Sequence, residues 1–374
     1  MGQRKLDPRI KELYEQKKKV YSYSKCNTIN QCEYQAWKLY IQKPKEQQLQ
    51  NCYSVLGSRI HDVLENIIND KAAESDLLPA MQQEFKDVEM LGLDFPKTSK
   101  GEYTIKAGWE ADMTHFCNNF VRPKGKFETE KLMLIDLGND RWLQGYIDLI
   151  KIVDEEKKII DIIDWKTSSK FSKEDLLHHG RQLVLYALSQ ENEGYTVKNI
   201  GWYMLKYARV DFLGYQRVNS KTRTELSIIC NRGKIVKELE KHIKRELEDL
   251  GYDELDIEIL LMNAKENNSL DELPEAVKNN YKVKPHIEKY EYSNELKDEA
   301  IKYINECADL FEKKVEIAEE EWTPKSFTKK TKTGKEVEDT FFCTQLCGFR
   351  KSCEHIKQYY EMKEFLNTSD EELF

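Results

Sequence analysis

Hydrophobic residues recur at helical spacing in the first part of the chain and change to strand-like runs near residue 128. Between positions 57 and 68, four isoleucine and leucine residues would share one face of a helix. Segment 1–20 has the pattern of a basic amphipathic helix, and segment 21–40 that of a turn leading into an aromatic-rich helix. These patterns predict that the chain opens with helices.

Three short runs rich in Ile, Leu, Val and aromatic residues follow, at 128–135, 142–153 and 158–167. A charged turn separates the last two runs, as in a β-meander. A helix is expected over 171–190 and a further strand over 199–207. Together they predict an α/β protein with a mixed β-sheet core flanked by helices.

From about residue 222 to 320, Glu, Lys, Leu and Ile recur at helical spacing, which predicts a helical insertion. The last fifty residues carry a cluster of cysteines and an acidic tail. We therefore divide the chain into an N-terminal helical segment, a mixed core, a helical region and a C-terminal cysteine-bearing segment, at 1–56, 57–210, 211–320 and 321–374.

The composition is that of an ordinary water-soluble globular protein, with 34% charged and 40% hydrophobic residues among 374. No apolar run reaches the length of a membrane span, and charged residues follow the start where a signal peptide would be apolar, so we expect a cytoplasmic protein without membrane contact. The net charge of −8 argues against a protein that coats nucleic acid, but it is compatible with a basic groove on an acidic body.

Two carboxylates and one lysine are the central chemical feature. Alternate residues of a strand share a face, so Asp164 and Lys166 point the same way, while Trp165 points to the other face. If the strand at 142–153 pairs with this one, Asp148 lies beside Asp164. Carboxylate oxygens bind Mg²⁺ or Mn²⁺, and a neighbouring lysine can orient or deprotonate an attacking water in phosphodiester cleavage. The alternative is a solvated strand, because Asp-Xaa-Lys is a common tripeptide.

Three further residues fit the same chemistry by their spacing. His61 lies on the helix at 57–68, one turn from Glu65, and is a ligand that suits Mn²⁺. Gln182 and Tyr186 share a helix face from which they could reach the edge of the site. The alternatives are a surface histidine and ordinary packing residues.

The order and spacing of these motifs resemble those of RecB-type PD-(D/E)XK nucleases. The motifs are Gly57-Ser-Arg-Ile-His61, Gly145-Tyr-Ile-Asp148, Asp164-Trp-Lys166 and Gln182-Leu-Val-Leu-Tyr186. The family includes the RecB and AddB nuclease domains, CRISPR-associated adaptation nucleases and phage exonucleases. The resemblance implies a restriction-endonuclease-like fold in which His61, Asp148, Asp164 and the main-chain carbonyl of Trp165 hold one or two Mg²⁺ or Mn²⁺ ions.

The resemblance also implies that Lys166 assists the attacking water and that Gln182 and Tyr186 help to position DNA. It favours exonuclease action on single strands or DNA ends in recombination, repair or phage DNA metabolism. One alternative is a CRISPR-adaptation-type or helicase-partnered nuclease that is active mainly in a complex, and another is a non-catalytic iron-sulfur DNA-binding module. The sequence has no phosphate-binding helicase motif. Any unwinding would come from a partner, such as a helicase, a single-strand-binding protein or a recombination protein.

Three cysteines, Cys343, Cys347 and Cys353, supply thiols within one short segment. A four-thiolate site needs one more ligand, and spacing alone does not choose it from the remaining six cysteines. Zinc and plain buried thiols are rivals to an iron-sulfur cluster, although the chain lacks the paired Cys-Xaa-Xaa-Cys motifs of zinc ribbons.

The iron-sulfur members of the family resemble this chain in carrying one cysteine before the histidine motif and three after the core. That likeness implies a 4Fe-4S cluster held by Cys32 and the three C-terminal cysteines, with the C-terminal segment bound to the N-terminal one. Cys26 is the alternative fourth ligand, since Glu33 replaces the proline that usually follows the first cysteine.

Overall fold

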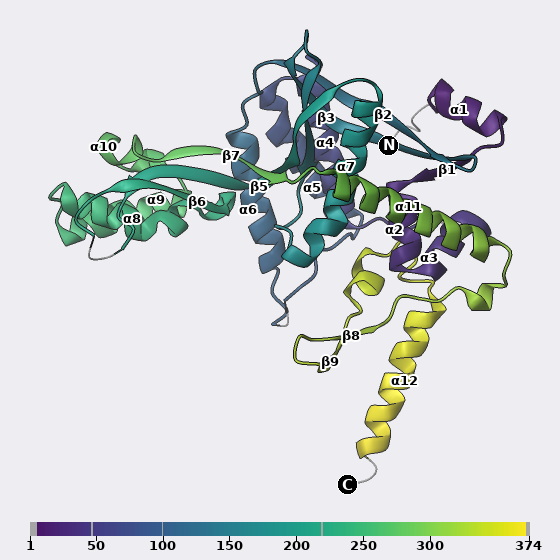
Figure 1. The fold of residues 1–374 in the computed structure, drawn as a ribbon. Coiled ribbons are helices and arrows are strands. Elements are labelled where there is room, and N and C mark those ends of the chain that lie inside the picture. Colours follow the sequence, from purple (N-terminus) through teal and green to yellow (C-terminus); the bar gives the residue numbers. More distant parts are fainter. Residues whose placement is uncertain (1–5, 46–47, 99, 218–219, 372–374) are drawn as a thin grey trace.

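The computed structural model describes residues 6–45, 48–98, 100–217 and 220–371 of the chain. A seven-stranded mixed sheet forms its centre, an elongated lobe extends from one end of the sheet, and the C-terminal helix projects from the body (Figure 1). The strands of the sheet are β1 (Lys19–Ser22), β2 (Lys126–Gly138), β3 (Arg141–Asp154), β4 (Ile159–Lys166), β5 (Thr196–Gly214), β6 (Thr224–Asn231) and β7 (Lys282–Tyr290).

Strands β2, β3 and β4 form the predicted meander, because each is antiparallel to the next. Asn139 and Asp140 join β2 to β3 with φ values of 52° and 60°, the left-handed conformation that a two-residue type I′ turn requires. Strand β5 is parallel to β4 and is reached through the crossover helix α7 (Lys173–Asn192). The expected mixed α/β sheet is therefore confirmed.

The two edges of β3 are used differently. Strand β2 pairs along one edge, whereas β1 and β4 share the other edge at opposite ends of the strand. Strand β1 pairs with residues 141–144 of β3, and β4 pairs with residues 149–154. No strand of the described chain pairs with residues 145–148 on this edge, so the sheet is interrupted there.

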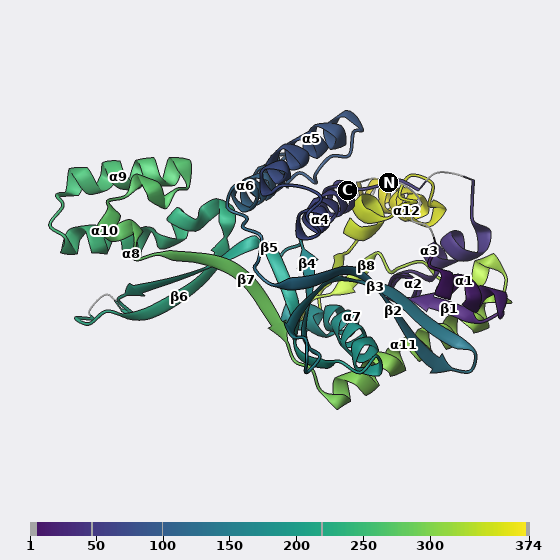
Figure 2. The same cartoon turned by 90° about the horizontal axis from the view of Figure 1, so that it is seen from above.

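Helices cover both faces of the sheet (Figure 2). Helices α4, α5 and α6 lie on one face, and α7 and α11 lie on the other. Helix α4 begins where the Asn51 side chain accepts a hydrogen bond from the main chain of Ser54, and α7 begins at a similar cap made by Ser172. Besides α7 and the helices of the lobe, the helices are α1 (Pro8–Glu15), α2 (Tyr23–Gln31), α3 (Glu33–Trp37), α4 (Cys52–Ile68), α5 (Leu77–Met90), α6 (Thr104–Asn118), α11 (Asn294–Val315) and the projecting α12 (Glu354–Glu371).

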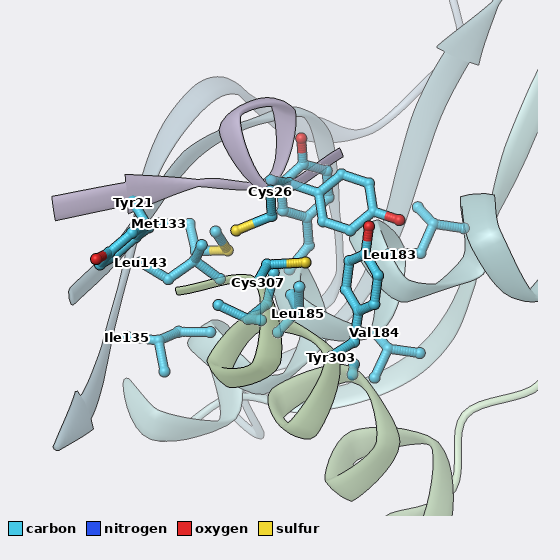
Figure 3. Close-up of a cluster of buried hydrophobic side chains, with 14 of the residues drawn as sticks. Tyr21, Cys26, Met133, Ile135, Leu143, Leu183, Val184, Leu185, Tyr303 and Cys307 are labelled. Carbon is cyan, nitrogen blue, oxygen red and sulfur yellow. The ribbon is translucent and has the colours of Figure 1, made fainter. Parts of the chain in front are cut away.

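The core on the α7 face joins distant parts of the chain. Leu183 and Leu185 of α7 pack with Ile135 of β2 and with residues of α2 and α11 (Figure 3). In this core, the thiol of Cys26 lies near that of Cys307 (Figure 3). The N-terminal segment is thus part of the same folded unit as the sheet.

The core on the opposite face packs α4, α5 and α6 against the sheet. Leu149 of β3 and Trp165 of β4 contribute to it from the sheet side, and Leu64 of α4 and Phe116 of α6 contribute from the helices. Trp165 therefore points away from the α7 face, as strand alternation predicts.

The lobe has its own core, built around Phe212, Leu239 and Leu261. It contains the outer part of β5, strand β6 and part of β7, covered by three helices: α8 (Ile235–Asp249), α9 (Glu254–Asn267) and α10 (Glu275–Lys278). The region expected to be helical therefore also contains strands. In β6, Leu226, Ile228 and Cys230 face the core of the lobe and alternate with the exposed Glu225, Ser227 and Ile229, so this run has a strand pattern within the region predicted to be helical.

The expected helix over 1–20 is shorter in the structure. Helix α1 covers only Pro8–Glu15, Lys17 takes a φ of 59°, and β1 begins at Lys19. The first five residues lie outside the described part of the chain. Among the helices described, none has the length and apolar character needed to cross a membrane.

The C-terminal segment contains a small hairpin and several tight helical turns. Strands β8 (Thr328–Lys330) and β9 (Glu336–Glu338) pair with each other and not with the main sheet. The short 3-10 or π segments of the chain are η1 (Lys38–Gln42), η2 (Glu74–Asp76), η3 (Arg232–Lys234), η4 (Leu270–Glu272), η5 (Glu319–Glu321) and η6 (Phe342–Leu346).

Candidate active site

Asp148 and Asp164 lie together at the interrupted edge of β3. The register pairs Leu149 with Ile163, so the next pair in the same register is Asp148 with Asp164. One oxygen of Asp148 accepts a hydrogen bond of 3.2 Å from the main-chain N–H of Trp165. Burial, followed by the charge of Asp164, raises the pKa of Asp148 well above its ordinary value. Two carboxylates held this close favour a cation between them.

Lys166 supplies a cation in the structure. Its Nζ lies 2.6 Å from Oδ2 of Asp164. Burial acts to lower the pKa of Lys166, but the attraction of Asp164 and Asp148 outweighs it, and the pKa is raised. Lys166 is therefore a protonated partner of the carboxylate pair. Apart from this ion pair, the buried Oδ2 of Asp164 accepts no hydrogen bond within the described chain.

His61 approaches the carboxylates from helix α4. Its Nδ1 lies 3.5 Å from Oδ2 of Asp148, and its ring contacts that of Trp165 edge-on at 5.7 Å between centroids. Burial lowers the pKa of His61. A neutral imidazole is the form that ligates metals, so the structure brings a third donor to the two carboxylates.

Gln182 and Tyr186 lie on α7, one turn apart. The amide of Gln182 donates a 2.8 Å hydrogen bond to the Tyr186 hydroxyl. Burial and the charges of Asp164 and Asp148 raise the pKa of Tyr186 well above its ordinary value, so the hydroxyl stays protonated near the carboxylates. The helix spacing seen in the sequence therefore places both side chains at the edge of the site.

Glu130 is a residue of the site that the sequence pattern did not single out. Its φ is 50°, and the β2–β3 ladder skips the Glu130–Asp148 pair while the register stays the same on both sides. After burial and the charge of Asp164, Glu130 is a further cause of the raised pKa of Asp148. Counting pairs outward from the Asn139–Asp140 turn places Lys131 opposite Asp148. The β-bulge between Asp136 and Gly138 shifts the register by one residue, so the sequence pattern alone did not reveal Glu130.

His179 was also missed. Its ring stacks on Phe171 with 4.0 Å between centroids. Burial, His178 and the charge of Lys166 lower the pKa of His179 to about 4, so it is neutral at physiological pH. Its position one helical turn before Gln182 is the signal that could have identified it.

The chemistry of these donors fits a divalent ion. Within the described residues, no group of three or more His, Cys, Asp or Glu side chains is already arranged around a metal position. Asp148 and Asp164 nevertheless offer hard oxygen ligands, and His61 a neutral nitrogen. A divalent ion would compete with the Lys166 ammonium for the buried oxygen of Asp164.

The three C-terminal cysteines predicted from their spacing border one small cavity together with Cys32. Cys26, the alternative fourth ligand, lies in the core against Cys307 and does not line this cavity. All four predicted thiols therefore border one cavity, although Cys32 and the other three are more than 300 positions apart in the chain. Like the carboxylates, they do not form a ready metal-binding group within the described residues.

Main-chain amides point at two of these sulfurs. Cys32 Sγ accepts hydrogen bonds of 3.4 Å from Gln35 and from Lys325, and Cys347 Sγ accepts one of 3.4 Å from the main chain of Phe349. Such donors stabilise thiolate ligands of metal clusters. Burial is the first cause of the raised pKa of Cys343, to about 12, and of Cys347, to about 11. A bound cation is what would hold such thiols as thiolates.

Direct hydrogen bonds also join the C-terminal segment to the N-terminal one. The main-chain N–H of Leu49 donates to the carbonyl of Gly348 at 2.9 Å, and that of Tyr34 donates to the carbonyl of Thr323 at 3.0 Å. Glu33 accepts hydrogen bonds from the main chain and side chain of Thr323. The carboxylate at the position of the expected proline therefore holds the two segments together.

Comparison with known proteins gives one finding. The sequence profile described as the PD-(D/E)XK nuclease superfamily matches residues 20–354, which include every residue of the site and of the cysteine cavity. No curated protein matches the chain.

Proposed function

Because the chain belongs to the PD-(D/E)XK nuclease superfamily, a family of metal-dependent nucleases, we propose that it is a Mg²⁺- or Mn²⁺-dependent deoxyribonuclease that acts at the interrupted edge of β3. The observation that carries the proposal is the meeting of Asp148, Asp164 and Lys166 at this edge, with His61 against Asp148. Side chains from α4, β3 and β4 contribute to one point, as hydrolysis of a phosphodiester requires.

Each residue has a role in the proposed reaction. His61, Asp148, Asp164 and the carbonyl of Trp165 would hold the ion, which supplies positive charge to the phosphate and a water of lowered pKa. Lys166, released from Asp164, orients the attacking water and offsets the charge that develops on the phosphate. The Gln182–Tyr186 pair holds the DNA strand beside the carboxylates.

The finer activity follows from the motif order. We propose exonuclease action on single strands or DNA ends in recombination, repair or phage DNA metabolism, with DNA as substrate and with a helicase, single-strand-binding protein or recombination protein as partner. The support is the likeness of the ordered motifs to RecB-type nucleases, together with a sheet interruption beside the carboxylates.

Digestion of end-labelled DNA tests this proposal. Purified protein with Mn²⁺ is expected to shorten single strands or duplexes with defined 5′ and 3′ overhangs from one end, and EDTA is expected to stop it. Nicks or internal cuts without end dependence would contradict the exonuclease assignment. DNA binding without any cleavage, alone or with a helicase, would point to a non-catalytic module.

Lys166→Met is expected to lower the single-turnover cleavage rate by about a hundredfold, because the water loses its positioning cation. The same variant should bind Mn²⁺ at least as tightly as the wild type, since the ammonium no longer competes for Asp164. Calorimetric titration with Mn²⁺ and single-turnover digestion measure the two effects separately.

Lys157→Met is the matched control, since Lys157 lies in the exposed turn between β3 and β4. It should leave both measurements unchanged. A Lys166→Met enzyme that cuts at the wild-type rate would exclude the role given to this lysine.

We also propose that Cys32, Cys343, Cys347 and Cys353 hold a 4Fe-4S cluster with a structural role. Their shared cavity and the main-chain N–H groups directed at Cys32 and Cys347 support this ligand set. Such a cluster would close a loop of some 300 residues and reinforce the hydrogen bonds between the two ends of the chain.

A further inference from the structure

A cavity of about 200 Å³ opens where the sheet is interrupted. It lies between residues 144–146 of β3, the start of α2 and the Gln182–Tyr186 turn of α7. Strand β1 pairs with β3 only as far as Gln144, and β4 pairs with β3 only from Leu149 onward. The edge of β3 between these two residues has no strand partner and is open to a ligand. We call this cavity the β3 pocket.

The β3 pocket is neutral. Met133 and Leu185 give it apolar walls, and Gln144, Tyr146 and Gln182 also border it. None of the residues that line it carries a charge. The side-chain oxygen of Gln144 is buried and has no hydrogen-bond partner within the described chain, although a buried amide oxygen normally has one.

These properties select one part of a nucleotide. The pocket has no cationic side chain to offset the charge of a phosphate, and the start of α2 that lines it is already capped, since the Ser22 hydroxyl accepts a hydrogen bond from the main chain of Lys25. A nucleobase is flat and uncharged, stacks on aromatic rings and exchanges hydrogen bonds with amides. The pocket shares Tyr186 and Gln182 with the site, so its occupant lies next to the phosphate that the attacking water would cleave.

We propose that the β3 pocket binds the unpaired nucleobase adjoining the scissile phosphate, with the Gln144 amide on the base edge and Tyr146 against its face. This inference rests on the proposed nuclease function and adds a substrate requirement to it. A base that is paired in a duplex has its edge covered by its partner, so the strand must be single at the point of cleavage.

Gly145 keeps the pocket open. A Cβ at this position would lie 3.0 Å from the methyl carbon of Met133 and 3.5 Å from the Tyr186 ring. A branched side chain in its place would occupy the space of the base, so Gly145→Val offers a way to fill the pocket.

Single strands with one abasic residue at a chosen position test the inference. Single-turnover cleavage should fall about tenfold at the one phosphate that adjoins the abasic residue and be unchanged at phosphates farther away, because base contacts of this kind are lost there. Gln144→Leu and Gly145→Val should each slow cleavage of the intact strand about tenfold and cause little further loss at the abasic position. Gln83→Leu, on the exposed face of α5, is the matched control and should behave as wild type.

Binding of the same strands in Ca²⁺, followed by fluorescence anisotropy, separates the two proposals. If wild type cuts no strand but still binds the intact strand about tenfold more tightly than the abasic one, the nuclease proposal fails and the pocket stands. Equal cleavage and binding of intact and abasic strands, or wild-type behaviour of Gln144→Leu, would overturn the pocket. The pocket would also be overturned if cleavage of a strand depended on its terminal phosphate and not on the base. Thermal unfolding shows whether each variant is folded. If Gly145→Val does not fold, Gln144→Leu alone tests the pocket.

Discussion

Asp164→Asn is expected to lower the rate of DNA cleavage by about a thousandfold or more, while the protein stays folded. Asp164 is 2% exposed, and its Oδ2 has the Lys166 ammonium as its ion partner. The amide keeps the shape of the carboxylate but removes the charge that a divalent ion and Lys166 both need. Single-turnover digestion of end-labelled DNA over a range of Mn²⁺ concentrations measures the loss.

Asp161→Asn is the matched control on the same strand. Asp161 lies three residues before Asp164 and points to the other face of β4, where it accepts a hydrogen bond from the side-chain amide of Asn199. It should cut DNA at nearly the wild-type rate. If Asp164→Asn and wild type cut equally, the carboxylate pair is not the reaction centre, and the proposed mechanism fails.

The part of the site that could be predicted from the sequence is local. The Asp164-Trp-Lys166 alternation follows from strand geometry, and the Gln182–Tyr186 spacing follows from helix geometry, so each pair shares a face in the structure as expected. The meander was also predictable, because its three apolar runs are separated by short turns.

The remainder depends on contacts between distant segments. Strand β1 has four residues and takes its structure from β3, more than 100 positions away, so its own pattern did not distinguish it from a helix. The interruption at residues 145–148 exists only because β1 and β4 end at different points along β3. Periodicity in one segment carries no information about such an arrangement.

The same distinction holds for the cysteines. Spacing identified the three C-terminal thiols, but no spacing rule relates them to a residue near the other end of the chain. The structure separates the two candidates that lie six positions apart: Cys32 lines the cavity at the end of α2, whereas Cys26 lies inside the core. Which thiols hold a cluster stays a prediction, and it can be tested directly.

Cys32→Ser is expected to cost the protein both its iron and about 3 kcal/mol or more of unfolding free energy, since binding of a structural metal group to its ligands contributes to folding. The main-chain N–H groups of Gln35 and Lys325 would then point at a serine oxygen, which is a poorer iron ligand than the cysteine sulfur. Elemental analysis and the absorption spectrum of anaerobically purified protein measure the cluster, and urea unfolding measures the stability. Nuclease activity should fall only as far as unfolding requires, because Cys32 does not contact the carboxylate pair.

Cys26→Ser is the control that makes this result specific. It replaces a buried thiol of α2 that packs in the core near Cys307, but it leaves the cavity intact. Iron content should therefore stay at the wild-type level, with a smaller loss of stability. Full iron in Cys32→Ser together with loss in Cys26→Ser would transfer the fourth ligand to Cys26. Zinc in place of iron in the wild-type protein would keep the four-thiol site but contradict the cluster, because four thiolates also suit a single zinc ion.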